Sequence, residues 1–288
     1  MRRTVIAVFA LLFAASGCTQ SGRETATPAL WEVTGPSGES GWLFGTIHAL
    51  PAPVSWQSEK VEHALAKSDR LVLEIDNADD PAALAEVFTR LGQTSGQPAI
   101  EQRVPIEARP QLKRLLDKTG LTEQRFDNVE TWAVAITLSQ AAAKDMDSRH
   151  GIDREIMRAA AGKPITQLEG AETQLRIFDS LPEKEQADLL AGVARDAGDG
   201  LMQDRLSRAW TSGNMAVIEA ETKSGLLADP ELRAALLVDR NVRWANTLAD
   251  LLKSGTKPLV AVGAAHMAGP EGLPALLAAR GFTVTRIQ

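Results

Sequence analysis

Two histidines stand at matching places in this sequence, each at the end of a short motif that begins with glycine. The first is His48 in Gly45-Thr46-Ile47-His48, and the second is His266 in Gly263-Ala264-Ala265-His266. A glycine at the carboxyl end of a strand lets the backbone turn sharply. The histidine that follows then projects above the sheet edge, where ligands collect in open α/β sheets. The two imidazoles share one site if their strands are near neighbours.

Two glutamates extend this pattern, because Glu74 closes one apolar run and Glu169 closes another. Two neutral imidazoles and a carboxylate form a metal site that suits Zn, Mn, Fe or Co and leaves positions open for water and substrate. Such a metal lowers the pKa of bound water and polarises a carbonyl, and a second carboxylate serves as general base. In the simpler alternative, the glutamates cap strands that face solvent and each histidine is an ordinary hydrogen-bonding residue.

The surrounding residues predict the elements that must position these side chains. Strand signals cover residues 31–34, 41–46, 70–75, 163–169, 258–263 and 282–287. Helical spacing covers 58–67, two long stretches at about 80–160 and 171–253 with an amphipathic helix at 230–252, and finally 272–280. The order strand, helix, strand is typical of a βαβ unit. We therefore predict an α/β fold whose mixed central sheet is assembled from N-terminal, middle and C-terminal strands, with a large helical insertion.

The first eighteen residues have the layout of an export signal. Met1-Arg2-Arg3 is basic, an apolar run follows, and Ala15-Ser16-Gly17-Cys18 is similar to the lipobox of bacterial lipoproteins. We expect residues 1–17 to be a signal peptide, Cys18 to be lipidated, 18–29 to be a flexible tether and 30–288 to form one domain. The expected location is the periplasmic side of a bacterial envelope membrane, held by the lipid. A plain exported protein and a retained anchor are the alternatives.

Composition excludes several other classes of protein. The chain has 288 residues, a net charge of −6 and 44% hydrophobic residues, values that are ordinary for a globular protein and exclude a disordered tail or a multi-span membrane protein. The acidic balance argues against a nucleic-acid partner, because phosphate contacts require clustered Lys and Arg. One cysteine permits no internal disulfide, so the fold must depend on core packing.

Several segments, in order along nearly the whole predicted domain, resemble the TraB/PrgY/GumN family, which includes the Tiki proteases. The matching segments are Leu43–Pro51, Leu71–Asp76, His150–Asp153, Gly162–Pro164, Leu168–Glu169, Gln174–Leu175, Asp239–Asn241 before Trp244, and Val260–His266 with Gly269 and Gly272–Leu273. Two departures occur: Asp239 stands where the family often has glutamate, and Met267 stands where leucine is usual. Neither changes a predicted site residue.

The resemblance implies a fold shared with erythromycin esterases and with the haem-binding ChaN lipoproteins. The family's two pairs of a glutamate and a glycine–histidine motif are filled here by Glu74 with His48 and Glu169 with His266. By matching position, His48, Glu74 and His266 would hold a divalent metal, Glu169 would be an orienting or second carboxylate, and Arg240 would steady charge on the substrate carbonyl. The other matched motif positions are Gly45, Gly263, Asp153 and Asn241.

Three functions remain open at this stage. The first is a lipid-anchored metal-dependent hydrolase of a peptide or small acyl substrate, with Mn, Co, Zn or Fe at the site. The second is a lipoprotein that binds haem or a metal without catalysis; haem would need a histidine ligand because the chain lacks tyrosine. The third is a metal-independent esterase with a histidine as general base. Arg240 is either a substrate-binding group or a structural partner of a buried carboxylate, and Asp153 favours the dipole of a helix that starts there.

Overall fold

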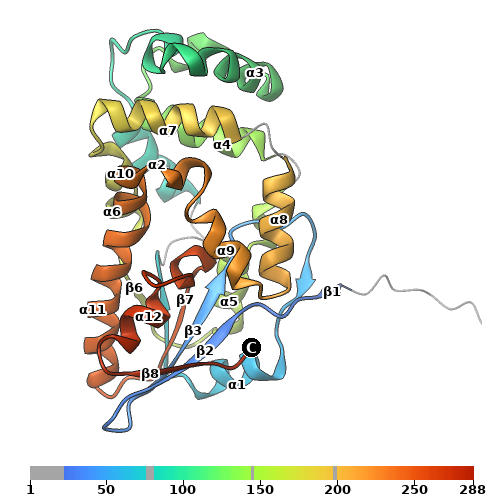
Figure 1. Ribbon diagram of the computed structural model, residues 1–288, viewed down its shortest axis with the longest axis vertical. Coiled ribbons are helices and arrows are strands. Elements are labelled where there is room, and N and C mark those ends of the chain that lie inside the picture. The colour runs from blue at the N-terminus through green and yellow to red at the C-terminus, as the bar shows by residue number, and fades with distance from the viewer. Residues whose placement is uncertain (1–22, 76–80, 144–145, 197–199) are drawn as a thin grey trace, which may run out of the picture.

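The computed structural model describes residues 23–75, 81–143, 146–196 and 200–288. One six-stranded mixed sheet lies at its centre (Figure 1), in the order β6-β5-β7-β3-β2-β8. The strands are β2 (Leu30–Thr34), β3 (Ser40–Thr46), β5 (Arg70–Leu73), β6 (Ile165–Gln167), β7 (Pro258–Gly263) and β8 (Thr283–Arg286). They come from the N-terminal, middle and C-terminal parts of the chain, so the predicted α/β fold is confirmed.

Four neighbouring strands run parallel, and this arrangement places their carboxyl ends at one edge of the sheet. β3 pairs with β7 so that Thr46 is opposite Gly263, β5 also pairs with β7, and β6 pairs with β5 so that Leu73 is opposite Gln167. β7 is buried along nearly its whole length, as expected for a parallel strand that is covered on both faces. The two glycine–histidine motifs therefore follow adjacent strands.

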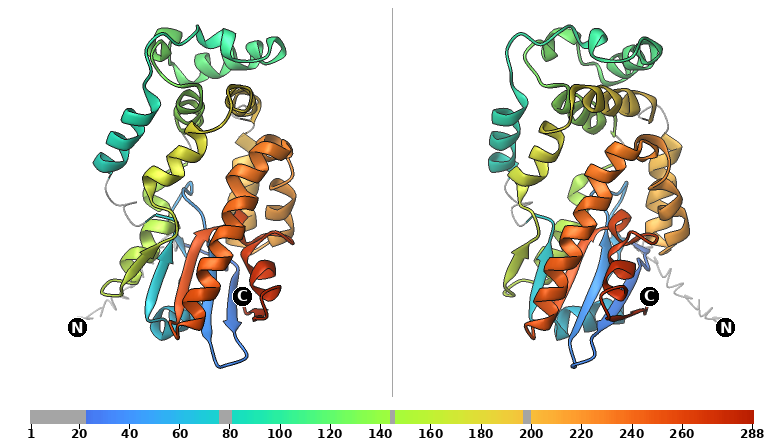
Figure 2. Two further views of the ribbon diagram at one scale, coloured as in Figure 1. Left: turned by 90° about the vertical axis from the view of Figure 1, so that its left-hand side faces the viewer. Right: turned by 60° about the vertical axis from the view of Figure 1, so that its left-hand side comes forward.

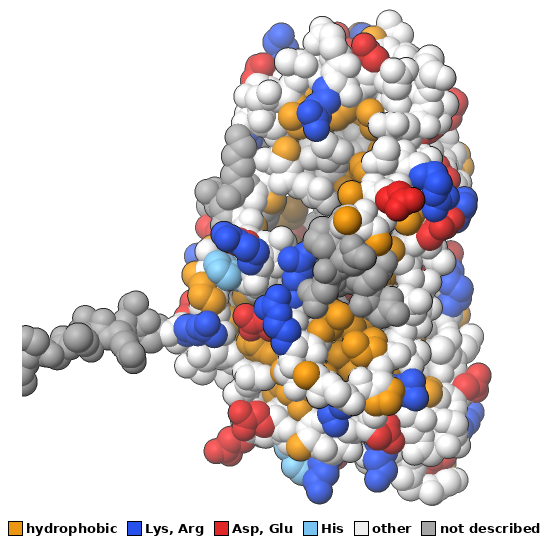
Figure 3. Space-filling view, turned by 180° about the vertical axis from the view of Figure 1, so that it is seen from behind, with side chains coloured by type: hydrophobic (Ala, Val, Ile, Leu, Met, Phe, Trp, Pro, Cys, Tyr) orange, Lys and Arg blue, Asp and Glu red, His pale blue; other side chains and the backbone are white. Residues whose placement is uncertain are grey.

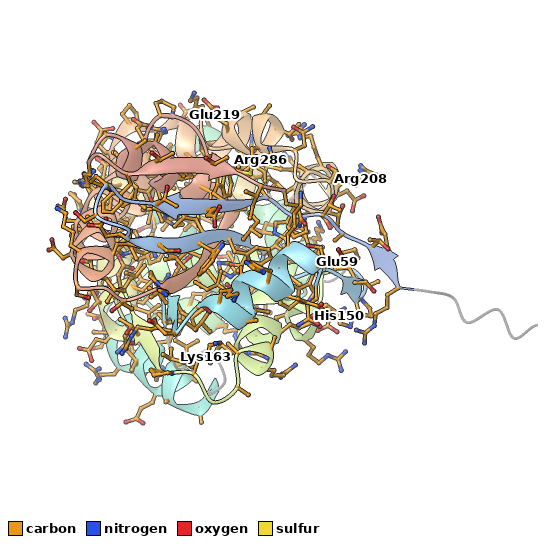
Figure 4. The ribbon with its side chains drawn as sticks, turned by 90° about the horizontal axis from the view of Figure 1, so that it is seen from below. Glu59, His150, Lys163, Arg208, Glu219 and Arg286 are labelled. Atoms are coloured by element: carbon orange, nitrogen blue, oxygen red, sulfur yellow. The ribbon has the colours of Figure 1, made fainter. Side chains whose placement is uncertain are left out.

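Helices cover both faces of the sheet (Figure 2). Leu259 and Ala261 pack in one cluster with α1 (Glu59–Lys67) and α5 (Ile152–Ala159). Val260 and Val262 pack in another with α11 (Asp239–Lys253) and α12 (Leu273–Ala278). The two clusters alternate along β7 because successive side chains of a strand point to opposite faces. Seen from below, α1 lies against the sheet, with Glu59 at the start of the helix (Figure 4).

A second, helical part stands beyond the carboxyl edge of the sheet, at the top of Figure 1. Its own core joins α2 (Pro81–Gly92), α3 (Arg109–Thr119), α4 (Thr131–Ala142), α6 (Ala171–Asp179) and α7 (Glu183–Asp196). α8 (Gly200–Thr211) and α9 (Met215–Glu221) connect this part back to the sheet. Short 3-10 helices complete the chain at Ile100–Arg103, Ile106–Ala108, Glu123–Phe126, Ser148–His150, Gly225–Ala228 (η5) and Ala264–Met267 (η7).

The insertion segments expected from the sequence do not all belong to this helical part. α5 and α11 fall within the predicted ranges 80–160 and 171–253, yet they pack on the sheet, because their apolar faces meet its two sides. The predicted helix at 230–252 runs from Pro230 to Lys253 as α10 (Pro230–Arg233), a π-helical segment (η6, Ala234–Val238) and α11. Asp229 caps its start by accepting from two backbone amides, and the π segment ends at Val238, two residues before Arg240.

The N-terminal segment differs from the expected tether. Glu24–Thr25 forms strand β1, which pairs in parallel with β4 (Val54–Ser55). Ala26 and Ala29 are only 1% and 3% exposed, and the amide of Thr27 donates to the carbonyl of Thr211. Their small apolar side chains fit the core, so this stretch belongs to the domain. The predicted signal peptide and Cys18 lie outside the described residues, and no described helix is long and apolar enough to cross a membrane.

Candidate active site at the carboxyl edge of the sheet

The two glycine–histidine corners touch one another at the ends of β3 and β7. A Cβ atom placed on Gly263 would lie 3.3 Å from Glu74 Oε1, 3.7 Å from His266 Cδ2 and 3.9 Å from His48 Nε2. A Cβ atom on Gly45 would lie 3.1 Å from the Cα of Ala264. Three of the predicted site residues therefore surround one point, and the absence of a side chain on both glycines is what permits the approach.

His266 is buried and held by an amide. Its ring is 5% exposed, its Nδ1–H donates to Asn241 Oδ1 at 2.6 Å, and Asn241 Nδ2 in turn donates to the carbonyl of Glu271. Nε2 accepts from Arg240 Nη1 at 3.3 Å. Burial lowers the pKa of His266 to about 4, although the charge of Glu74 opposes that effect. His266 is therefore neutral at pH 7, with the Nε2 lone pair directed into the site.

His48 has the opposite surroundings, because it is held by a carboxylate and reached by water. Its Nδ1–H donates to Asp153 Oδ2 at 2.8 Å, and Asp153 Oδ1 accepts from Thr46 Oγ1 at 2.6 Å. The charge of Asp153 and this hydrogen bond raise the pKa of His48 to about 10. Water reaches 73% of the His48 side chain and screens part of the attraction. Without a metal, His48 is therefore protonated at pH 7.

Gly151 explains how Asp153 reaches His48. The amide of Ile152, the first residue of α5, donates to the carbonyl of Ile47 at 2.9 Å. A Cβ atom on Gly151 would overlap the carbonyl oxygen of His48. The start of α5 thus packs directly on the corner after β3 and brings Asp153 beneath the imidazole. The sequence predicts Asp153 in the first turn of a helix, which is confirmed, but it gives no signal for the contact with His48.

Arg240 holds both glutamates. Nη2 lies 2.9 Å from Glu74 Oε2 and 2.9 Å from Glu169 Oε2, Nε donates to Glu169, and Nη1 donates to His266 and to the carbonyl of Leu236. The guanidinium also stacks 4.6 Å from the centre of the Trp244 ring. Every N–H of Arg240 thus faces a protein acceptor, so the geometry favours the structural alternative over direct contact with a substrate carbonyl.

Glu74 is the carboxylate that the site presents to a ligand. Its Oε1 accepts from the amide of Gly263 at 2.8 Å, and Oε2 accepts from Gln174 and Arg240. Burial raises the pKa of Glu74, but His266, His48, Arg240 and the Gly263 amide together bring it below its ordinary value. Glu74 lines the cavity, whereas the side chain of Glu169 is 4% exposed and lies behind Arg240. The role of Gln174 as a hydrogen-bond donor to Glu74 was not predicted from the sequence.

The types of donor atom suit a divalent metal, but the potential ligand atoms of His48, Glu74 and His266 are not all close to one another. Both histidines have Nδ1 bound to an oxygen and present Nε2, the arrangement usual for metal-binding imidazoles. Among the described residues, however, the group whose potential ligand atoms all lie within 4.8 Å of one another is Glu185, Asp229 and Glu231 in the helical part, not His48, Glu74 and His266. A metal on His266 Nε2 would have to displace Arg240 Nη1.

A cavity of about 600 Å³ opens from these strand ends toward the helical part. Its floor contains His48, Glu74, Arg240, Gly263 and His266, and its walls come from α6, α7, α8, α9 and η5. Trp210 of α8 joins wall and floor, because its Nε1–H donates to the carbonyl of Gly45 at 2.8 Å. The volume is in the range of pockets that hold small molecules.

Comparisons with known proteins agree with this arrangement of motifs. The model of the TraB/PrgY/gumN family matches residues 29–286. The chain belongs to the TraB/PrgY/gumN family. Similar relatives are the uncharacterized protein YbaP of Shigella flexneri and that of Escherichia coli K12, each 26% identical over 265 residues, covering 89% of this chain and 94% of the relative. No solved structure matches the chain.

This TraB/PrgY/gumN member thus brings most of the sequence-predicted residues to one place. His48, Glu74, Arg240 and His266 line the cavity. Glu169 and Asn241 contact members of that set from behind, and Asp153 does so from α5. Cys18 lies outside the described residues. Thr46 and Trp244 complete the site: the first fixes Asp153, and the second lies 4.5 Å from the His266 ring.

Proposed function

We propose that this protein is an exported, lipid-anchored hydrolase of peptide or other acyl bonds that uses a divalent metal held by His48, Glu74 and His266. The observation that supports it most is that Glu74 Oε1, the His266 ring and His48 Nε2 all lie around Gly263, with Nδ1 of each histidine bound to an oxygen acceptor. A bound metal would supply an activated water and polarise the substrate carbonyl.

The charges of the site favour a divalent cation as well. Glu74, Glu169 and Asp153 carry three negative charges, and Arg240 carries one positive charge. With both imidazoles neutral, these four residues therefore carry a net charge of −2. The further contact of Glu169 with Arg243 is long, at 3.5 Å. Arg243 is 57% exposed, so water screens its charge. A divalent ion would neutralise the remainder, in exchange for the proton on His48.

The protein's own residues have distinct roles in this proposal. Asp153 and Asn241 fix the orientation of the two imidazoles, while Gln174 and the Gly263 amide fix Glu74. Arg240 and Glu169 form a buried pair that holds Glu74 in place from behind.

Metal content of the purified protein tests this function. We expect about one equivalent of a first-row divalent metal in the wild type by elemental analysis, and its loss in both His48→Ala and His266→Ala. His63→Ala is the matched control, because His63 is exposed on α1 and lies outside the cavity. Hydrolysis of acyl esters should stop after chelation and return when metal is added. Equal metal content in wild type and His266→Ala would remove the proposal.

A metal-independent hydrolase is the second candidate, favoured by one specific observation. Arg240 Nη1 already occupies the Nε2 lone pair of His266, and His48 forms a pair with Asp153 at the open side of the site. An imidazole paired with a carboxylate serves as general acid in acyl transfer while it is protonated and as general base once it has lost the proton. This candidate predicts activity that chelators leave unchanged and that both His48→Ala and Asp153→Asn reduce at least tenfold.

The lipid anchor has its own test. A Cys18→Ser variant should move from the membrane fraction to the soluble fraction of bacterial cells and should no longer incorporate labelled fatty acid. Ser16→Ala, a change within the same segment, should leave both properties unaltered. Continued membrane attachment of Cys18→Ser would instead indicate a retained N-terminal anchor.

A further inference from the structure

The cavity wall formed by α8 and η5 contains apolar side chains that are not part of a hydrophobic core cluster of the described residues. Met202 and Leu206 of α8 and Leu227 of η5 line the cavity, and none of them belongs to a hydrophobic cluster among the described residues. The view from behind shows hydrophobic side chains gathered in the middle of the molecule and in the hollow above it (Figure 3). Apolar groups outside a core gain most when a ligand removes them from water.

Three polar side chains of the cavity lining already donate hydrogen bonds within the protein. Thr222 donates to the carbonyl of Glu219, Ser224 donates to Glu221, and Gln174 donates to Glu74. Glu221 also forms an ion pair with Arg205. An extended peptide brings one donor and one acceptor per residue and needs partners for them once it leaves water. An aliphatic chain needs none, so it fits this wall better.

We propose that the site accepts esters or amides of straight-chain fatty acids, with the acyl carbonyl at the strand ends and the chain along Met202, Leu206 and Leu227. This inference rests on the proposed hydrolase function and names its substrate class. In the reaction, the bond between the acyl carbon and the leaving oxygen or nitrogen breaks. Water adds its hydroxyl to the carbon and a proton to the leaving group. A cavity of about 600 Å³ has room for a medium-length chain besides the carbonyl group.

Binding of neutral amide probes to chelator-treated protein, in which the proposed metal-dependent hydrolysis is switched off, tests the chain site separately from catalysis. The probes are acetamide, butanamide, hexanamide and octanamide, titrated into the full-length protein by calorimetry. We expect binding to tighten about fourfold for each added methylene. Equal affinity for acetamide and octanamide would overturn the proposal.

Substitutions in the cavity wall test where the aliphatic chain of the ligand binds. Leu206→Asp and Leu227→Asp should each weaken octanamide binding at least tenfold, because a carboxylate then faces the methylenes. Val242→Asp is the matched control: Val242 is 41% exposed on α11 and does not line the cavity, so binding should be unchanged. Circular dichroism checks that each variant folds. Unchanged octanamide binding in both folded wall variants would overturn the assignment, and if both fail to fold, the wild-type probe series decides alone.

Hydrolysis of p-nitrophenyl acetate and p-nitrophenyl octanoate separates the two proposals. Preference for octanoate in kcat/KM, together with tighter octanamide binding, supports both. Chain-length-dependent binding without any hydrolysis supports the chain site and removes the hydrolase. Hydrolysis of both esters at equal kcat/KM, with no chain-length dependence of binding, supports the hydrolase and overturns the chain site. Efficient cleavage of peptides but not of octanoyl compounds also overturns it.

Discussion

The two glycine–histidine corners have the same spacing but opposite surroundings. His48 is 73% exposed in its side chain and paired with the carboxylate of Asp153, whereas His266 is 5% exposed and paired with the amide of Asn241. The pKa of the first is raised and that of the second is lowered. The strand and the glycine thus determine where each imidazole lies, but the helix packed against it, α5 or α11, determines its charge.

The two histidines of the site therefore differ in their protonation. The buried corner keeps His266 neutral, with its Nε2 accepting from Arg240. The exposed corner holds a proton on His48 that can be exchanged with the water of the cavity.

Replacing Arg240 with methionine should affect the buried corner more than any other change. It would leave Glu74 and Glu169 buried without the cation that they share, and breaking such pairs lowers the free energy of unfolding by about 3–5 kcal/mol. Urea denaturation measures the change. Arg243→Met is the control, because Arg243 contacts Glu169 at 3.5 Å but is 57% exposed, so its effect should stay below about 1 kcal/mol. Equal midpoints for Arg240→Met and wild type would show that the buried pairs do not stabilise this corner.

Gly45→Ala should be the next most destabilising change, because the two corners touch here. The added methyl group would lie 3.1 Å from both the Cα and the Cβ of Ala264, so β3 and the segment after β7 must separate. Overpacking of this kind lowers the free energy of unfolding by about 1–3 kcal/mol. Thermal unfolding followed by circular dichroism is sufficient to detect it. A melting temperature equal to that of the wild type would indicate that the two corners are less closely packed in solution.

Asp153→Asn should alter the exposed corner mainly through the charge of His48. The pKa of His48 should fall from about 10 toward its ordinary value of 6.5, and NMR titration of the ring protons in chelator-treated protein measures it. Since the folded-state pKa is raised, the stabilisation by the pair is complete below pH 6.5 and is lost as the pH rises through about 10. The stability difference between wild type and variant should therefore shrink over that interval, from at most about 1 kcal/mol because water screens the pair.

His150→Asn is the control for this titration, since it changes a neighbouring residue and leaves Asp153 in place. His48 should titrate in this variant as it does in the wild type. A pKa of His48 that is the same in Asp153→Asn as in the wild type would assign the shift to a group other than Asp153.

Local sequence patterns predicted the strands of the sheet and the residues that follow them. β3 and β7 each end in a glycine–histidine motif, but the sequence left open whether the two strands are neighbours, and their pairing in the structure is what brings His48 and His266 to one site. The same reasoning predicted Glu74 and Glu169 at strand ends.

The partners of these residues could not be predicted in the same way, because they depend on tertiary packing. Nothing local to Asp153 indicates that α5 will lie beneath His48, and the requirement for glycine at position 151 becomes visible only when the His48 carbonyl is in place. Likewise, the sequence left the role of Arg240 open, and only the packing of α11 places its guanidinium between two buried carboxylates. The pairing of Glu24–Thr25 with β4 also depends on tertiary packing, and no local pattern in residues 24–29 indicates it.

Gly263→Ala should change the fold least and the site most. The backbone at Gly263 has a φ of −47°, which alanine adopts without strain. The new methyl group would lie 3.3 Å from Glu74 Oε1, a tight contact that a small shift of this side chain relieves, and 3.7 and 3.9 Å from His266 and His48, so the free energy of unfolding should fall by only about 1 kcal/mol. The same methyl group would occupy the space that these three residues share, so metal content and esterase activity should fall at least tenfold.

Gly45→Ala provides the opposite case, with a larger loss of stability at the corresponding motif position. If Gly263→Ala retained full metal content, the three residues would not bind the metal at their common point, and the exposed pair of His48 and Asp153 would remain as the centre of the chemistry.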